Sequence, residues 1–448
     1  MKCDQAQTEM IAYHRGELKE NEKRRLEDHL ARCPQCRLEM EDARKVLEWT
    51  EAASSAVVIK RVLEVFENAI KAGASDIHFE PQFDNALQVR FRVDGVLHHN
   101  DTISSQERIA IITRIKMMSE MNVKETKTTQ DGRIPIRLVD DPKEYDLRVS
   151  CIPFVYGEGI VIRILDKSSV MIGLDKLGMY DDQLSLLKRL RKEPMGMLVV
   201  SGLTGAGKTT TAYSMLKEFG HSHNKLVSVE DQVECTLQGV NQIQVNLKTG
   251  VTSANALRAL FRHDPDIVMV NEIRDAETAV LCMHSALTGH LVIGVTLARD
   301  AQEALTRLRD FGIEDFLTGS ALLGISSQRL ARRICQNCKQ EIEVDLDDPL
   351  IRSLGITPDD LASHKIYRGK GCDNCRSTGY RGRIGIFEIL EIDSELACMI
   401  SGSASEEEIL EKARDKGFMS MKEDAKRKVL DGLTSPEEAF RVVWSSWY

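Results

Sequence analysis

The stretch MLVVSGLTGAGKTTTAY, residues 197–213, decides the fold of this 448-residue chain. Within it, residues 202–209 match the pattern G-x-x-x-x-G-K-[ST], directly after an apolar run and before a helical pattern. The glycines allow successive backbone N–H groups to turn inward around phosphate oxygens, and the following helix adds its positive N-terminal end. A glycine-rich turn that binds nothing is the plain alternative, but both flanks favour a phosphate-binding loop.

The residue types in this loop point to ATP and Mg²⁺ as its ligands. Lys208 is placed to reach the β- and γ-phosphates, and Thr209 is placed to offer its hydroxyl to Mg²⁺. The predicted nucleotide contacts are the loop and the start of the next helix: Gly202, Leu203, Thr204, Gly205, Ala206, Gly207, Lys208, Thr209 and Thr210.

Short apolar runs and helical patterns alternate from about residue 170 onward. The runs suited to strands buried on both faces are residues 197–201, 226–230, 267–270 and 291–296, and the helical segments are 208–218, 254–261 and 276–287. This alternation predicts an α/β fold, with a parallel sheet covered by helices on both faces.

Carboxylates follow two of these runs. Glu272 ends the segment DIVMVNE, and the segment LVSVEDQVE carries Glu230, Asp231 and Glu234. The carboxyl ends of parallel strands meet at one edge of a sheet, where ligands of such folds bind. We therefore expect these acids to form a Mg²⁺ and water site opposite the loop. Taken singly, each acid is an ordinary solvated loop residue.

A mixed α+β block precedes this region and extends to about residue 168. Residues 57–72 show helical spacing and end at Gly73, and residues 106–121 form a second helical segment. Between and after them lie the strand-like runs IHFEP, LQVRFRVDGVLHH and YDLRVSCIP, with Asp94 and Gly95 forming a tight turn.

Composition places the chain among ordinary globular proteins of two or three domains. It is 42% hydrophobic and 29% charged, and it lacks the roughly 20 uninterrupted apolar residues of a membrane-spanning helix. The N-terminus, MKCDQAQTEM, has no apolar signal-peptide core, so we expect the protein to stay in the cytoplasm. The net charge of −9 argues against direct nucleic-acid binding.

Two groups of cysteines predict zinc sites. Cys335, Cys338, Cys372 and Cys375 form two C-x-x-C knuckles, and four thiolates suit a closed, structural Zn²⁺ site. Near the start, Cys3, His29, Cys33 and Cys36 can form a Cys₃His site. For this second group a redox dithiol or a lone knuckle, with the histidine merely on a helix face, stays open.

Several segments, in their order along the chain, resemble the secretion ATPase superfamily that powers type II secretion and type IV pilus assembly. ASDIHFEP, VRFRVDGVL, QDGRI and LRVSCIPFVYGEGIVIRIL look like its N-terminal, PAS-like domain. GLTGAGKTTTAY, VEDQVE, LRALFRHDPDIVMVNEIRDAETA and TGHLVIGVTL look like its RecA-like motor domain. The resemblance covers residues 57–448.

This resemblance implies roles for individual residues. Glu234 matches the residue that activates water, and Glu272 matches the carboxylate of the second Walker motif. The arginines that the resemblance places at the phosphates or in support of the site are Arg148, Arg163, Arg258 and Arg262, and His290 is the histidine retained from the histidine box. The resemblance also implies a hexameric ring.

The sequence departs from the family pattern at two positions. Ala298 stands where the family usually has the second histidine of its histidine box, and Asn271 stands where glycine commonly precedes the carboxylate. Alanine cannot hydrogen-bond a phosphate, so these changes leave nucleotide binding expected and predict weaker turnover or coupling.

The two cysteine groups also resemble known modules. RICQNC and GCDNCRSTGYRGRIGIFE resemble the metal-binding subdomain of assembly-type family members, and AYHRGELKENEKRRLEDHLARCPQC resembles the zinc finger of anti-sigma factors. The predicted domains are a zinc-finger module at 1–50, the N-terminal α+β domain at 51–168, the RecA-like domain at 169–330, a tetracysteine subdomain at 331–386 and a helical subdomain at 387–448.

The resemblance favours an ATP-hydrolysing motor that drives pilin or pseudopilin assembly through an inner-membrane platform protein. It would lie at the inner face of the bacterial inner membrane and would associate with that membrane through partners only. The alternative is a nucleotide-dependent switch with weak turnover, whose N-terminal zinc finger binds a partner such as a sigma factor. The sequence does not distinguish pilins from pseudopilins, although the tetracysteine group leans towards extension rather than retraction.

Overall fold

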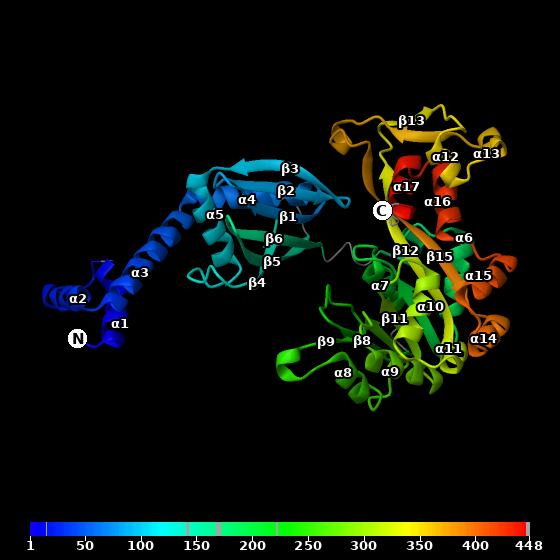
Figure 1. The fold of residues 1–448 in the computed structure, drawn as a ribbon, viewed down its shortest axis with the longest axis horizontal. Helices are drawn as coiled ribbons and strands as arrows, with labels where there is room; N and C mark the ends of the chain where they lie inside the picture. Colours follow the sequence, from blue (N-terminus) through cyan, green and yellow to red (C-terminus); the bar gives the residue numbers. More distant parts are fainter. Residues whose placement is uncertain (15, 140–142, 167–171, 221–222, 445–448) are drawn as a thin grey trace. The chain divides into compact units, whose positions relative to one another are not determined.

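A computed structural model describes residues 1–14, 16–139, 143–166, 172–220 and 223–444 (Figure 1). The chain divides into two compact units, the first running from Met1 to Asp166 and the second making up the rest. The predicted boundary between residues 168 and 169 lies outside the described residues, and the other domain boundaries stay predictions. In the described part of the chain, no helix combines the length and apolar character needed to cross a bilayer.

Helices open the first unit. They are α1 (Cys3–His14), α2 (Glu20–Arg32), α3 (Pro34–Ala53) and α4 (Ala56–Lys71). The first three share a small core in which Ala6, Met10, Leu26 and Cys36 are buried. Helix α4 confirms the helix predicted at residues 57–72, and the chain turns at Gly73 with a φ of 68°.

An antiparallel sheet forms the body of the first unit, in the order β3-β2-β1-β6-β5-β4. Its strands are β1 (Ala74–Pro81), β2 (Leu87–Val93), β3 (Val96–Ile103), β4 (Gln130–Arg137), β5 (Glu144–Phe154) and β6 (Gly157–Asp166). Helices α4 and α5 (Ser105–Met118) bury their apolar side chains on this sheet. The predicted Asp94–Gly95 turn is confirmed: both residues have positive φ, 48° and 85°, as a tight hairpin turn of this kind requires.

The second unit contains a seven-stranded sheet in the order β15-β12-β7-β11-β10-β8-β9. Its strands are β7 (Gly196–Ser201), β8 (Leu226–Glu230), β9 (Val240–Gln244), β10 (Ile267–Asn271), β11 (Leu291–Thr296), β12 (Leu322–Ile334) and β15 (Tyr380–Glu391). Neighbouring strands pair in parallel except β15, which is antiparallel to β12. The predicted parallel sheet is confirmed, with one antiparallel strand added at its edge.

Helices cover both faces of this sheet, because the strands alternate side chains between two apolar cores. The helices and short turns of the second unit are η1 (Leu174–Lys176), α6 (Asp181–Leu190), α7 (Lys208–Glu218), η2 (Leu247–Thr249), α8 (Ser253–Leu260), α9 (Ala276–Leu287), α10 (Ala301–Asp310), α11 (Asp315–Ala321), α12 (Pro349–Leu354), α13 (Pro358–Ser363), η3 (Asp373–Cys375), α14 (Ser394–Ser401), α15 (Glu406–Asp415), α16 (Met421–Leu430) and α17 (Pro436–Val443). Residues of β7 illustrate the alternation: Val199 belongs to one core, and Leu198 and Val200 to the other.

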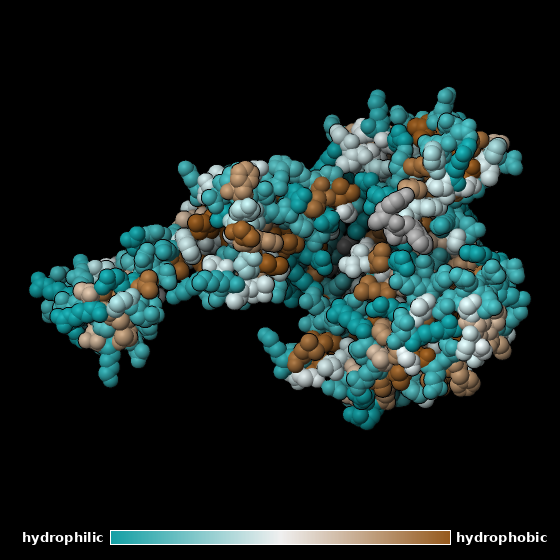
Figure 2. All heavy atoms as spheres, in the orientation of Figure 1, coloured by the Kyte–Doolittle hydropathy of each residue, from teal (hydrophilic) through white to brown (hydrophobic). Residues whose placement is uncertain are grey.

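A smaller layer completes the second unit. Strands β13 (Lys339–Ile342) and β14 (Ile366–Gly369) form a two-stranded sheet, and a third core joins this region to α16 and α17. On the face shown in Figure 2, hydrophilic side chains predominate and apolar ones form small, separate patches.

Candidate nucleotide site and metal centres

The phosphate-binding loop connects β7 to α7. Strand β7 is buried along its whole length and ends at Ser201, and α7 begins at Lys208. Gly205 and Gly207 have φ values of 80° and 85°, a region that favours glycine. At Gly202 an added Cβ would lie only 2.6 Å from the carbonyl oxygen of Gln328, so the close approach of β12 also requires glycine.

Lys208 lies inside this loop. Its ammonium group donates hydrogen bonds to the carbonyl oxygens of Gly202, at 2.9 Å, and Leu203, at 3.1 Å. Burial lowers the pKa of Lys208, and the nearby charge of Glu272 opposes that effect. The electrostatic influence of Glu272 on the ammonium indicates that the loop and Glu272 share one local environment.

Strand β12 supports the loop through side chains that the sequence did not reveal. Gln328 donates from Nε2 to the carbonyl oxygen of Ala206 at 2.7 Å, and the hydroxyls of Ser201 and Ser327 share a hydrogen bond at 2.6 Å. No local signal could have identified these residues, because β12 lies more than a hundred positions further along the chain.

Asp231 and Glu272 come together at the edge of the sheet that carries the loop. Asp231 directly follows β8, and Glu272 directly follows the neighbouring strand β10. Arg274 joins them: its Nη1 lies 2.8 Å from Asp231 Oδ2, and its Nη2 lies 2.7 Å from Glu272 Oε2. Burial raises the pKa of Asp231, while Arg274 lowers it. This arginine lies in the segment NEIRD, to which the sequence analysis assigned a site role only for Glu272.

Glu272 adopts an unusual backbone conformation for a residue other than glycine. Its φ of 74° lies in the left-handed region, where side chains cost energy. The turn allows the N–H of Ile273 to donate to the carbonyl oxygen of Val295 in β11, at 2.7 Å. The strained residue is therefore fixed between two strands and held at the end of β10.

Glu230 is wholly buried and takes part in a structural network. Its oxygens accept hydrogen bonds from the Tyr213 hydroxyl, from Ser228 at 2.5 Å and from Gln242 at 3.0 Å. These contacts occupy the carboxylate, so its burial does not support the predicted contact with nucleotide. Glu234 is half-buried after β8, and its backbone hydrogen-bonds to Tyr213 in α7, the helix that follows the loop.

Arg148 and Arg163 lie in the first unit as register partners on β5 and β6. Arg163 Nε is 3.1 Å from Asp76 Oδ1 on β1, and Arg133 on β4 is the register partner of Arg148. One row across the sheet therefore gathers both predicted arginines and a third, Arg133. The sequence could not reveal Arg133 as part of the row, because the pairing of β4 with β5 is a tertiary feature.

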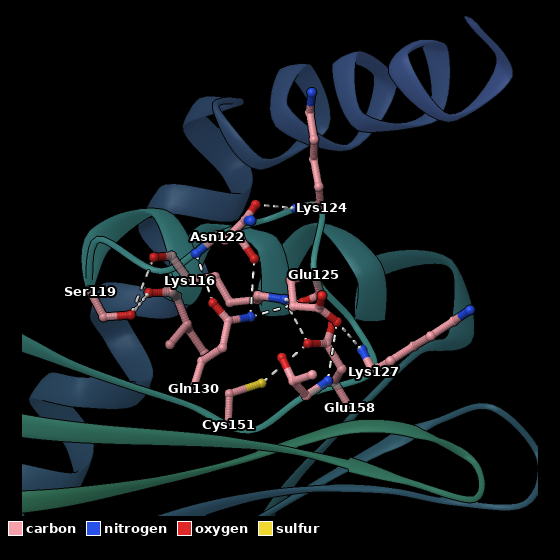
Figure 3. Close-up of polar contacts among 11 residues, drawn as sticks. Lys116, Ser119, Asn122, Lys124, Glu125, Lys127, Gln130, Cys151 and Glu158 are labelled. Atoms are coloured by element: carbon pink, nitrogen blue, oxygen red, sulfur yellow. Dashed lines mark hydrogen bonds and ion pairs between the residues drawn. The ribbon is translucent and has the colours of Figure 1, made fainter. Parts of the chain in front are cut away.

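A buried ion pair fixes the strands that carry these arginines (Figure 3). Lys116 on α5 is 1% exposed, and its Nζ lies 2.6 Å from Glu158 Oε1 at the start of β6. The same ammonium donates to the carbonyl oxygen of Glu125, and Cys151 on β5 donates from Sγ to Glu158. Figure 3 shows these side chains converging between α5 and the sheet.

Arg258 lies in α8, and Arg262 lies two residues beyond Leu260, the last residue of that helix. Arg258 forms an ion pair with Glu277 near the start of α9, and Arg262 Nη1 donates to the carbonyl oxygen of Arg258 at 2.9 Å. In the described part of the chain neither side chain pairs with Lys208 or Thr209, so their predicted support of the site stays a prediction.

His290 lies at the opposite edge of the sheet from the loop. It precedes β11, and its carbonyl oxygen accepts the N–H of Gly196, the first residue of β7. A strand rises about 3.3 Å per residue, so the length of β7 separates this histidine from the loop by roughly 17 Å. The structure does not bring His290 to the loop of its own chain. Ala298, buried at 2% exposure, follows β11 at the loop edge.

The residues beside the loop fit a nucleotide with Mg²⁺. Thr209 in the first turn of α7, together with Asp231 and Glu272, offers the oxygen ligands that Mg²⁺ prefers. Three buried oxygens at this edge, Asp231 Oδ2, Thr296 Oγ1 and Gln328 Oε1, take part in no hydrogen bond among the described residues. Polar groups buried without partners are rare and suit a site that completes its hydrogen bonds with a ligand or water.

The second cysteine group has the geometry of a tetrahedral metal site. Sγ atoms lie 3.9 Å apart for Cys335 and Cys372, 3.8 Å for Cys338 and Cys375, and 3.7 Å for Cys372 and Cys375. Four sulfurs bound to Zn²⁺ at 2.3 Å would be about 3.8 Å apart. Although burial opposes the change, backbone N–H donors lower the pKa of Cys375 to about 6. These residues fit a structural Zn²⁺.

The N-terminal group also comes together. Cys3 Sγ lies 3.9 Å from Cys33 Sγ, and His29 Nε2 lies 3.3 Å from Cys36 Sγ. The four ligand atoms are within 4.8 Å of one another. Because helix α1 brings Cys3 back to the knuckle between α2 and α3, the set fits a Cys₃His zinc site better than a lone dithiol.

The fold and the loop define an α/β protein of the P-loop nucleotide-binding class. Comparison with known proteins narrows this class. The sequence profile described as Type II/IV secretion system protein matches residues 51–441, and a zinc-finger profile matches residues 3–37. The chain belongs to the Type II/IV secretion system protein family.

Curated relatives agree with this membership. Type IV pilus assembly ATPase PilB of Acinetobacter baylyi is 41% identical over 389 residues, which cover 86% of this chain and 66% of that protein. Type II secretion system protein E of Pseudomonas aeruginosa is 41% identical over 394 residues, covering 88% and 76%. PilB of Thermus thermophilus is 41% identical over 398 residues, covering 89% and 44%. The chain thus spans less than two thirds of both PilB relatives.

Solved structures share the fold at low sequence identity. The ATPase DotB of Legionella pneumophila has a TM-score of 0.61 at 19% identity, covering 86% of this chain and 95% of that one. The pilus retraction motor PilT with bound ADP has a TM-score of 0.57 at 22% identity, covering 85% and 96%. These likenesses support the two-unit α/β architecture.

Proposed function

We propose that this protein is an ATP-hydrolysing motor of a type II secretion or type IV pilus assembly system. One observation carries the proposal: the loop with Lys208, and the acids Asp231 and Glu272, converge at the same edge of the parallel sheet. The names of the curated relatives, pilus assembly ATPases and type II secretion proteins, supply the process that the motor would serve.

The residues divide the work of phosphoryl transfer between them. Backbone N–H groups of the loop and the Lys208 ammonium hold the β- and γ-phosphates, while Thr209 and Glu272 position the metal. Bound Mg²⁺ neutralises charge on those phosphates. Glu234 orients the attacking water, and Arg148 and Arg163 add positive charge where negative charge develops. Arg258 and Arg262 support the same site in a homo-oligomer, for which the family suggests a hexamer.

The partner in this proposal is an inner-membrane platform protein, and the cargo is a pilin or pseudopilin. The motor works at the cytoplasmic face of the inner membrane and reaches that membrane through partners, without binding nucleic acid. Ala298 offers no polar group at the loop edge of β11, so we expect slower turnover than a histidine at this position would give.

A regulatory switch with weak turnover is the second candidate. The zinc-finger profile match at residues 3–37 and the clustered Cys₃His set favour it, because such a module is suited to binding a partner such as a sigma factor. Replacing Cys33 and Cys36 by serine tests the module. Loss of membrane recruitment with normal ATPase activity would assign it to docking, whereas unchanged recruitment would remove docking as its role.

Steady-state ATPase assays distinguish the two candidates. We expect the Lys208→Ala and Glu272→Ala variants to lose about 100-fold or more of the wild-type rate, with nucleotide binding lost only in Lys208→Ala. Lys192→Ala, at an exposed lysine outside the site, serves as the matched control. Equal background rates in all four proteins would favour the switch, and no affinity of the wild type for Mg²⁺–ATP would end both candidates.

A further inference from the structure

Arg274 has no part in the function proposed above, yet it occupies the centre of the acidic cluster. Its two terminal nitrogens contact carboxylates from different strands, Asp231 after β8 at 2.8 Å and Glu272 after β10 at 2.7 Å. Both acids are mostly covered, with side-chain exposures of 33% and 26%, while Arg274 is 61% exposed. The guanidinium is thus an outer cap over two inner carboxylates.

The charges explain why such a cap is needed. Two carboxylates at one edge repel each other, and each also repels the phosphates of a nucleotide in the adjacent loop. The guanidinium donates a hydrogen bond to Glu272 and forms an ion pair with Asp231, so its extended, planar charge reaches two carboxylates at once, which a compact ammonium does less well. It neutralises the same two carboxylates that a divalent cation would neutralise.

We propose that Arg274 is a positioning residue that substitutes for the divalent cation at Asp231 and Glu272. The guanidinium holds both carboxylates in place and offsets their charge until Mg²⁺ enters with the nucleotide. The cation then takes over the carboxylates, and the exposed side chain turns outward. This inference rests on the proposed nucleotide site and adds a residue that sets the dependence of that site on metal.

The proposal makes a prediction that a merely structural ion pair does not make. Loss of a structural contact weakens nucleotide binding equally with and without metal. Loss of a cation substitute weakens metal-free binding, because the uncovered carboxylates repel the phosphates. It also raises the affinity of the site for Mg²⁺, because a competing positive charge has gone.

Titration of full-length protein with a fluorescent ATP analogue measures both effects. In EDTA we expect Arg274→Gln to bind the analogue about three- to tenfold more weakly than wild type. With saturating Mg²⁺ the affinities should agree, and the half-saturating Mg²⁺ concentration should fall by about the same factor in the variant. Arg274→Lys keeps the charge but contacts one carboxylate at a time, so its affinity for the analogue in EDTA should lie between those of wild type and Arg274→Gln.

Arg352→Gln is the matched control, since Arg352 is 65% exposed and pairs with a single carboxylate, Asp347, far along the chain. Equal losses with and without Mg²⁺, or no change in either, would overturn the inference. A second experiment needs no nucleotide: the binding of Mn²⁺ alone is measured by electron paramagnetic resonance. Tighter Mn²⁺ binding by Arg274→Gln than by wild type supports the inference, and equal binding contradicts it. Failure of wild type to bind the analogue refutes the proposed function separately.

Discussion

Glu388 is a buried acid that joins three elements. It lies on β15, and its two oxygens accept the backbone N–H groups of Ala301, at 2.6 Å, and Met421, at 2.9 Å, the first residues of α10 and α16. Burial raises the pKa of Glu388 to about 7, even though these two donors act in the opposite direction. The native state therefore retains a proton on this residue over a range in which the unfolded chain has lost it.

The pKa of Glu388 predicts a pH dependence of stability. The unfolded value is 4.5 and the folded value is about 7. The stability that the protonated Glu388 contributes to the native state is fully present below pH 4.5, declines as the pH rises, and is lost above about pH 7. It amounts to about 3 kcal/mol in the free energy of unfolding.

Comparison with Glu388→Gln isolates this contribution from other titrating groups. The variant should gain stability relative to wild type as the pH rises from 4.5 to 7.5, measured by denaturation at a series of pH values. Replacement also disturbs one N–H contact, so the slope of the difference carries the test and its absolute value does not. A difference that is flat over this range would show that folding does not raise the pKa of Glu388.

Individual residues were predictable where chemistry follows a local pattern. Sequence spacing alone identified the glycines of the loop, Lys208 and the two cysteine groups, and the structure brings each cysteine group together. Gln328 and Arg274 were not predictable, since their roles come from strands that meet only in the folded sheet. His290 was assigned to the site through the resemblance alone, and it directly precedes β11, which places it at the amino edge of the parallel sheet, away from the loop.

The ion pair of Lys116 and Glu158 ties helix α5 to strand β6. The lysine is 1% exposed and the glutamate 13%, so removing one partner leaves the other buried without a counter-charge. We expect Lys116→Met to destabilise this part of the unit by about 3–5 kcal/mol. Hydrogen exchange of backbone amides in α5 and β6 measures the loss locally.

A double substitution separates charge from packing. Lys116→Met with Glu158→Gln removes both charges and should recover part of the lost protection. The exposed pair of Lys60 and Glu64 provides the control, and Lys60→Met should change protection by less than about 0.5 kcal/mol. Equal effects of Lys116→Met and Lys60→Met would refute the structural role given to the buried pair.

Helices and strands were predicted correctly where the spacing of apolar residues was regular. The alternation around the Asp94–Gly95 turn and the helical spacing before Gly73 predicted β2, β3 and α4. The antiparallel pairing of β15 with β12 had no such signal, because residues 335–379 separate the two strands. Strand direction at a sheet edge depends on how distant segments pack, which periodicity does not encode.

The whole chain should bind two zinc ions. The four ligands of each predicted site lie within one of the two units. The buried core of the N-terminal module consists of only Ala6, Met10, Leu26 and Cys36. So small a core needs metal to fold, because it buries too little apolar surface to offset the entropy of ordering the chain. Metal analysis should find two zinc ions per chain in wild type.

Serine variants assign the ions to their sites. Cys33→Ser with Cys36→Ser should leave one ion and lower the helical circular dichroism signal. Cys338→Ser with Cys375→Ser should also leave one ion, with increased hydrogen exchange in residues 331–386. Retention of two ions by either variant would contradict that assignment. The sequence predicted both ligand sets, Cys3 included, and the fold shows how Cys3 reaches the knuckle of α2 and α3, as the first residue of helix α1.

Strand β12 has a mechanical consequence. It contacts the phosphate loop through Ser327 and Gln328, and seven residues further along it is followed by Cys335 of the tetracysteine group. At about 3.3 Å per residue, one continuous strand, clamped by β15 along its side, spans roughly 23 Å between these points. The register of its pairing with β15 shifts between Arg332 and Ile334, so we expect a displacement of the loop to travel along the strand to Arg332 and to be partly absorbed at this irregularity before it reaches Cys335.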